Sequence, residues 1–143
     1  MAVGLSAPGT LAPVSGIELA TLASGIKADS ALDLLLISYC EGSSVAGVFT
    51  QNRYCAAPVT IARERLTSND TRALLINSGN ANAGTGAEGD AIARRLCQKV
   101  AGELGVAEHQ VMPFSTGVIG QQLPVDLMSS ACLLYTSPSP RDS

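Results

Sequence analysis

The sequence predicts a single mixed α/β domain. Three observations indicate this fold class. Short apolar runs of strand length alternate with segments rich in Gly, Ser or Asn, one long stretch has the period of an amphipathic helix, and 143 residues are enough for one hydrophobic core. Hydrophobic residues make up 46% of the chain and charged residues 15%, and the 14 glycines indicate close packing of small side chains.

The first third of the chain contains the first candidate strands. Residues 1–15 are rich in Gly, Pro, Ser and Ala and predict a loop or an extended arm. Partial alternation over residues 16–27 predicts a first strand. The continuous apolar run at residues 33–39 and the shorter run at 45–50 flank a Gly/Ser break, which predicts a β-hairpin.

The next stretch contains a helix, a strand and a long loop. Residues 58–66 are predicted to begin extended and to turn helical at residue 62, a turn follows at 67–70, and the apolar run at 72–76 predicts a buried strand. The thirteen residues 77–89 include no large apolar side chain. A long loop inside a compact domain is usually functional, so this segment is a candidate for a site.

The clearest helix covers residues 90–104. Asp90 is suited to cap its start and Gly105 to end it. Its apolar stripe repeats at every fourth position and consists of Ile92, Leu96, Val100 and Leu104. Residues 110–114 then predict another strand, and residues 124–128 predict the start of a further helix.

Composition excludes several functional classes. The net charge is −3 and the basic residues are not clustered, which argues against nucleic acid and anionic membrane surfaces as partners. The longest apolar run, residues 31–39, contains Asp33 and is too short to cross a bilayer. The first basic residue is Lys27, so no signal peptide is predicted. We therefore expect a soluble, cytoplasmic protein.

Cysteine and histidine usage argues against a metal site. The four cysteines form no CxxC pair, and the chain has only one histidine, so no metal or metal cofactor is expected. Isolated cysteines are most simply buried thiols of a reducing compartment. His109 lies in a polar connection and is expected to be a surface residue, not a catalytic base.

The polar triplet Ser115-Thr116-Gly117 directly follows an apolar run. The pattern predicts a strand that stops at a tight turn, where Gly117 adopts positive φ and its backbone approaches a ligand. A Thr116 hydroxyl beside a main-chain N–H gives a candidate oxyanion hole. The alternative is an ordinary glycine turn at a strand end, which these residues alone favour.

Two further features leave alternatives open. Residues 84–89 match the dinucleotide pattern GxGxxG, but no acidic residue ends the following strand, where Phe114 and Ser115 stand. Asn77, Asn80 and Asn82 either hold their loop in shape or let backbone amides line a pocket for a polar substrate. With neither a GxSxG elbow nor a P-loop lysine, the residues indicate an oxyanion hole without a nucleophile.

Three segments together resemble the ornithine acetyltransferase family, the bifunctional glutamate N-acetyltransferases of the cyclic arginine pathway. They are AGVFTQNRYCAAPV at 46–59, INSGNANAGTG at 76–86 and STGVIGQQLPVD at 115–126. Their order and spacing match the family, and the resemblance covers about residues 14–128. It implies a layered α/β sandwich with mixed sheets between helices, and an α₂β₂ assembly that forms after self-cleavage.

The resemblance also implies a reaction. A threonine freed by self-cleavage takes the acetyl group from N2-acetylornithine and passes it to glutamate, and bifunctional members also use acetyl-CoA as donor. No other cofactor is implied. The family's Thr-Gly pair, which holds the oxyanion, corresponds to Thr116 and Gly117 here. Whether the parent enzyme is monofunctional or bifunctional stays open.

One departure from the family is decisive for activity. The family's cleavage signature is a Met-Thr-Thr-Asp-Thr-like run well beyond the STG motif, and this sequence contains no Thr-Thr pair. The nucleophile is therefore not among these residues, and the substrate-binding residues are unknown. We expect an incomplete sandwich that is inactive alone and exposes strand edges and apolar surface.

The last residues suggest where native sequence ends. Residues 1–131 are expected to be the N-terminal part of the enzyme domain. Residues 132–143, CLLYTSPSPRDS, look like a non-native tail derived from a sequencing adaptor. Two other functional classes remain as alternatives, a nucleotide-binding module that uses residues 84–89 and a non-catalytic interaction domain.

Overall fold

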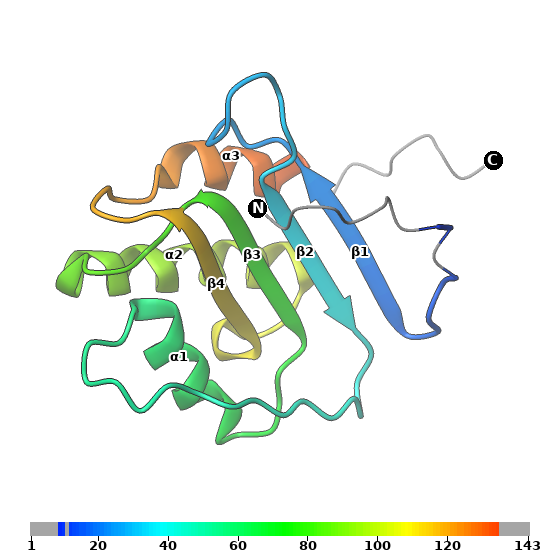
Figure 1. Ribbon diagram of the computed structural model, residues 1–143. Coiled ribbons are helices and arrows are strands. Elements are labelled where there is room, and N and C mark those ends of the chain that lie inside the picture. Colours follow the sequence, from blue (N-terminus) through cyan, green and yellow to red (C-terminus); the bar gives the residue numbers. More distant parts are fainter. Residues whose placement is uncertain (1–8, 11, 135–143) are drawn as a thin grey trace.

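A computed structural model describes residues 9–10 and 12–134. These residues form one four-stranded sheet and three α-helices, so the predicted mixed α/β class is confirmed (Figure 1). The strands are β1 (Ile17–Leu22), β2 (Leu34–Tyr39), β3 (Ala73–Asn80) and β4 (Val111–Val118). The helices are α1 (Ala57–Leu66), α2 (Gly86–Leu104) and α3 (Val125–Leu134), with a short 3-10 helix, η1 (Glu108–Gln110), before β4.

The sheet is mixed and its spatial order is β1-β2-β3-β4. β2 pairs antiparallel with both β1 and β3, whereas β3 and β4 are parallel. Parallel neighbours need a crossover connection, and α2 supplies it between β3 and β4. β4 is consequently an edge strand, which matters for the candidate site that it carries.

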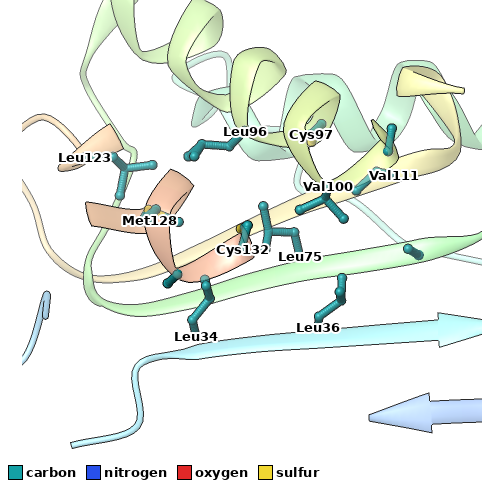
Figure 2. Packing of buried hydrophobic residues seen from close by; sticks show 13 residues of the cluster. Leu34, Leu36, Leu75, Leu96, Cys97, Val100, Val111, Leu123, Met128 and Cys132 are labelled. Carbon is teal, nitrogen blue, oxygen red and sulfur yellow. The ribbon is translucent and has the colours of Figure 1, made fainter. Parts of the chain in front are cut away.

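Helices α2 and α3 cover one face of the sheet, behind the strands in Figure 1. Figure 2 shows leucines of β2 and β3 pointing into the layer formed by Leu96 and Val100 of α2 and by Met128 of α3. These three side chains are at most 2% exposed. Burial of one such side chain stabilises the fold by roughly 1.5–3 kcal/mol. Ile92 and Leu104 pack at the margin of this cluster, so the predicted stripe of α2 is confirmed.

The opposite face of the sheet is apolar too, but only in part covered. Two rows of side chains cross all four strands in register, Leu19-Ile37-Leu74-Met112 and Thr21-Leu35-Ile76-Phe114. Leu19 is 64% exposed and Phe114 is 39% exposed, whereas Met112 is buried. We call these two rows the open face. Among the described residues, no helix is long and apolar enough to cross a membrane.

The predicted hairpin between residues 33–39 and 45–50 is wrong. The first run is β2, but the second is irregular, and Val48 is 99% exposed. Both edges of β2 already bond to β1 and β3, so no edge is left for a third partner. The apolar pattern of two neighbouring runs does not indicate that β2 pairs with β1 and β3, which lie further away in the sequence.

Three predicted boundaries also move. α1 is helical from Ala57, not extended at its start, because Pro58 in the first turn has a backbone angle that suits a helix. Residues 77–80 continue β3, and α2 begins at Gly86, so the predicted loop shrinks to five residues. Asp90 therefore does not cap α2 but bonds to Arg94, one turn later, at 2.9 Å. Gly105 ends the helix with φ +67°, as predicted.

The predicted boundary of the tail falls inside α3. The helix runs to Leu134, and Cys132 is 5% exposed and belongs to the hydrophobic cluster. Residues 135–143 lie outside the described part of the chain. The position at which native sequence gives way to a tail stays a prediction.

Candidate functional site

The triplet Ser115-Thr116-Gly117 lies within β4, so the predicted strand end at this point is wrong. β4 continues to Val118 because its pairing with β3 continues, with Gly79 opposite Gly117 and Asn80 opposite Val118. The sequence showed a polar triplet and a glycine, which usually mark a turn. Here Gly117 permits the backbone of β4 to run close to that of β3, whereas a Cβ at Gly79 would meet the side chains of Ile26 and Lys27.

Gly117 has the predicted positive φ, at +127°, but β3 explains the need for a glycine. A Cβ at this position would lie 2.3 Å from the Gly79 carbonyl carbon and 2.6 Å from the Asn80 nitrogen. Any side chain there would collide with backbone, which cannot move aside easily. The structure therefore gives Gly117 a packing role that does not depend on a ligand.

The pairing of β4 with β3 fixes the direction of the Gly117 N–H. The Ala81 N–H donates to the Val118 carbonyl at 2.8 Å, and Gly79 is the partner of Gly117. Successive backbone groups of a paired strand point alternately toward and away from the neighbouring strand. Because the groups of Val118 face β3, the N–H of Gly117 faces the outer edge of β4.

That outer edge is covered only along its first half. There α1 packs beside β4, and the buried guanidinium of Arg65 donates to the Val111 carbonyl and to Glu108. Residues 116–122, in contrast, are all exposed. The Gly117 N–H thus lies on the part of the edge that α1 does not reach.

Thr116 projects from the open face beside this N–H. Its Oγ1 donates to the backbone carbonyl of Asn77 at 3.2 Å. A hydroxyl has a single hydrogen, so Thr116 can donate to a ligand only if that hydrogen turns about the Cβ–Oγ1 bond and leaves the Asn77 carbonyl. The structure therefore brings the two predicted site residues together at the corner between the sheet edge and the open face.

Ser115 points to the opposite face and meets the asparagines of β3. Its hydroxyl donates to Oδ1 of Asn77 at 2.5 Å, and Nδ2 of Asn77 donates to the Asn80 carbonyl at 2.7 Å. Nδ2 of Asn80 in turn donates to the Gln122 carbonyl at 3.1 Å. Two asparagines that sequence reasoning left undecided therefore contact the predicted site. The strand register that reveals this contact depends on pairing between distant segments.

Asn82 has a different role from its two neighbours. Its Nδ2 donates to the Gly89 carbonyl at 2.8 Å, and its Oδ1 accepts from the Thr85 hydroxyl at 2.5 Å. These bonds hold the five-residue loop against the first turn of α2. For Asn82, the interpretation as a residue that shapes its loop is confirmed.

The GxGxxG segment borders a hollow of about 490 Å³, which is also lined by Tyr54, Cys55 and Asp90. Residues 46–59 and 76–86, two of the three segments of the family resemblance, therefore meet at this hollow. A phosphate at the start of α2 would lie near the carboxylate of Asp90 and would be repelled by it. The geometry does not favour the nucleotide-binding alternative.

His109 is exposed, as predicted. Its side chain is 56% accessible, and Nε2 lies 3.7 Å from a carboxylate oxygen of Asp70. It lies in η1, two residues before β4 begins, whereas Thr116 is near the other end of that strand. The five steps of strand from Val111 to Thr116 alone span about 17 Å, so His109 cannot act as a base at Thr116 in this arrangement.

The thiols differ in environment. Burial raises the pKa of the Cys97 and Cys132 thiols to about 11 in each case. Cys40 is exposed and Cys55 is half-buried. The prediction of buried thiols is therefore correct for two cysteines and wrong for Cys40, which lies just beyond the end of β2.

Comparisons with known proteins agree with the resemblance. The model of the ArgJ family matches residues 18–137. The arginine biosynthesis bifunctional protein ArgJ of Methylococcus capsulatus is 55% identical over 121 residues, which are 85% of this chain and 29% of the relative. The protein of the same name from Pseudomonas fluorescens is 50% identical over 131 residues, which are 92% of this chain and 32% of the relative. The chain thus spans about a third of the length of these curated relatives.

Solved structures match as well. The ornithine acetyltransferase of Mycobacterium tuberculosis, complexed with ornithine, superimposes with a TM-score of 0.79 at 39% identity, over 82% of this chain and 64% of that one. ArgJ of Bacillus halodurans gives a TM-score of 0.78 at 33% identity, over 82% of this chain and 62% of that one. The predicted family is confirmed, and the chain belongs to the ArgJ family.

Proposed function

We propose that this chain is part of an acyltransferase of arginine biosynthesis, in which Thr116 and Gly117 form the oxyanion hole. The reaction moves an acetyl group from N2-acetylornithine to glutamate. The observation that carries the proposal is the outward N–H of Gly117 beside the Thr116 hydroxyl, on an exposed stretch of strand edge. The names of the relatives support the substrate class, since one of them is an ornithine acetyltransferase complexed with ornithine.

The chemistry requires two donors at one oxygen. When a nucleophile adds to the acetyl carbonyl, the C=O electron pair moves to oxygen and leaves a negative charge there. The ornithine amine departs with a proton when the carbonyl re-forms, and attack by the glutamate amine repeats the sequence in reverse. Loss of one oxyanion-hole donor costs about 10²–10³ in kcat, or roughly 2.7–4 kcal/mol.

In this proposal the nucleophile lies in a part of the enzyme that is outside these 143 residues. The sequence has no Thr-Thr pair of the kind on which the family's self-cleavage depends. We therefore expect the complete enzyme to be an α₂β₂ assembly in the cytoplasm, with acetyl-CoA as an optional second donor. This chain, purified alone, is expected to release no ornithine from N2-acetylornithine.

A graft into a relative tests the proposal. Residues 18–128 would replace the matching segment of the Methylococcus capsulatus relative, which is 55% identical over the aligned region. Thr116→Ala in this graft is expected to lower kcat by about 10²–10³, whereas Thr67→Ala, at an exposed position just after α1, is not. An active graft whose kcat is unaffected by Thr116→Ala would show that this hydroxyl does not stabilise the oxyanion.

A further inference from the structure

Asn77 of β3 accepts hydrogen bonds from both Ser115 and Thr116. Its side chain is 1% exposed and lies on the helix-covered face, opposite Ser115 in register. Its amide oxygen accepts from the Ser115 hydroxyl at 2.5 Å, and its backbone carbonyl accepts from the Thr116 hydroxyl at 3.2 Å. Asn77 therefore contacts the candidate site from both faces of the sheet.

The orientation of this amide is determined by its neighbours. The Asn80 carbonyl can only accept a hydrogen bond, so the nitrogen of the Asn77 amide must face it, at 2.7 Å. The amide oxygen is then left for the Ser115 hydroxyl. Ser115 and Asn77 also line a hollow of only about 10 Å³ beneath α3. That volume leaves little room for a water molecule, so water does not readily replace either bond.

Backbone pairing with β3 and polar side chains, not apolar contacts, hold the end of β4 in place. Every residue from 116 to 122 is exposed, so apolar burial does not anchor this stretch. Gly117 also has more backbone freedom than any other residue type would have. Directly before Gly117, the hydroxyls of Ser115 and Thr116 both donate to Asn77, and only the bond of Ser115 goes to the side chain of Asn77. On β3, the same amide holds the Asn80 carbonyl, at the level where Gly117 packs against the backbone.

We propose that Asn77 is a positioning residue, whose buried amide holds the end of β4 so that the N–H of Gly117 and the hydroxyl of Thr116 keep a fixed direction. This inference rests on the proposed function of that pair as an oxyanion hole. Such a hole accelerates a reaction only if its donors are oriented before the charge develops. A side chain that fixes them thus affects catalysis without touching substrate.

The chain provides a matched control in Asn82. It is also 1% exposed, and its amide makes two hydrogen bonds of similar length, 2.8 and 2.5 Å, but to Gly89 of α2 and to Thr85 before it, not to β4. Leucine has the same branched shape as asparagine but no donor or acceptor. Asn77→Leu and Asn82→Leu each remove the hydrogen-bond partner of buried polar groups. Only in Asn77→Leu do these groups belong to Ser115 and Asn80.

The test is an NMR measurement on the full-length, ¹⁵N-labelled chain. In Asn77→Leu we expect the order parameter of the Gly117 N–H to fall from about 0.85, the value of rigid backbone, to below about 0.6. Its residual dipolar coupling is expected to shrink as well. Ser115→Ala removes only one hydroxyl and is expected to change the same signals in the same direction. In Asn82→Leu the signals of Gly117 are expected to stay at their wild-type values.

Two results would overturn the inference. One is a rigid Gly117 with unchanged couplings in both Asn77→Leu and Ser115→Ala, and the other is an equal loss of order in Asn82→Leu. If Asn77→Leu does not fold, Ser115→Ala decides alone. The measurement uses no substrate, so its failure leaves the effect of Thr116→Ala on kcat unaffected. Conversely, if Thr116→Ala has no effect in the graft, the proposed function fails even when Asn77 anchors β4.

Discussion

The two faces of the sheet have similar side chains and different surroundings. On the helix-covered face, Leu34, Leu36 and Leu75 are 4%, 6% and 3% exposed. On the open face, the neighbouring residues Leu35 and Ile76 are only half-buried. Residue type alone does not distinguish the two faces, and what differs is the cover that α2 and α3 provide to one of them.

This difference explains the continuous apolar runs of β2 and β3. A strand that is buried on one face alternates between apolar and polar residues, whereas a strand that is buried on both faces is apolar throughout. The runs LLLI in β2 and ALLI in β3 belong to the second kind. The described residues supply one cover, and the open face is where a second layer of the sandwich would pack. The curated relatives are about three times as long and contain polypeptide for such a layer.

The largest expected effect contrasts a leucine beneath α2 with one on the open face. Leu96→Ala is expected to lower the free energy of unfolding by roughly 2–5 kcal/mol, because it opens a cavity in a close-packed cluster. Leu96 is 2% exposed and Leu19 is 64% exposed. Leu19→Ala is expected to change stability by less than about 0.5 kcal/mol. Urea denaturation monitored by circular dichroism measures both.

Equal losses for the two variants would contradict the contrast between the faces. They would indicate that the open face is covered in solution, for example by a second copy of the chain. Sedimentation of the Leu19→Ala and wild-type chains at several concentrations distinguishes that case, because association would depend on concentration.

The same contrast shows how much of the fold the sequence predicts. The stripe Ile92, Leu96, Val100 and Leu104 and the left-handed end at Gly105 were predictable because a helix is determined by local period and local backbone preference. The hairpin expected between residues 33–39 and 45–50 does not form, because the pairing of a strand depends on segments that are distant in the sequence. The predicted site residues lie together, but the sequence placed them in a turn, since it gave no sign that Gly79 lies opposite Gly117.

The second prediction concerns two glycines in different surroundings. Gly117→Ala forces a methyl group into the backbone of β3 at a positive φ, and it is expected to cost at least about 1–3 kcal/mol and to disturb the end of the β3–β4 pair. Gly102, in α2, has open space around it. Gly102→Ala is expected to stabilise the chain by about 0.5–1 kcal/mol. Thermal unfolding measures both, and a neutral Gly117→Ala would contradict the close packing of the two strands.

The third prediction concerns Asp33, a buried carboxylate that borders the open face. Burial would raise its pKa, but the backbone N–H groups of Lys27 and Ser24, at 2.9 and 2.6 Å, hold the pKa below its ordinary value. Since the folded pKa is the lower one, the stabilisation is complete above the unfolded value of about 3.9 and is lost as the pH falls through the folded pKa.

Asp33→Asn is the variant that tests this linkage. At pH 7 it is expected to be less stable than the wild type, and the difference is expected to shrink as the pH falls below about 4. Urea midpoints at pH 7, 5, 4 and 3 measure the trend. Asp29→Asn, at an exposed position of the same loop, serves as the control. If the difference in stability between wild type and Asp33→Asn were the same at pH 3 as at pH 7, the charge of Asp33 would not be the cause of the destabilisation.

The smallest expected effect leaves the fold intact and compares thiols inside and outside the helix-covered cluster. Burial raises the pKa of Cys97 and Cys132 to about 11, and both side chains are at most 5% exposed. At pH 8 only about 0.1% of such a thiol is thiolate, against about a quarter for a thiol of ordinary pKa near 8.5. With a disulfide reagent at pH 8, we expect rapid labelling of Cys40 and slow labelling of these two, as peptide mapping would report. If Cys97 reacted as fast as Cys40, the layer between the sheet and α2 would be open to solvent. The helix-covered face would then not be better packed than the open face.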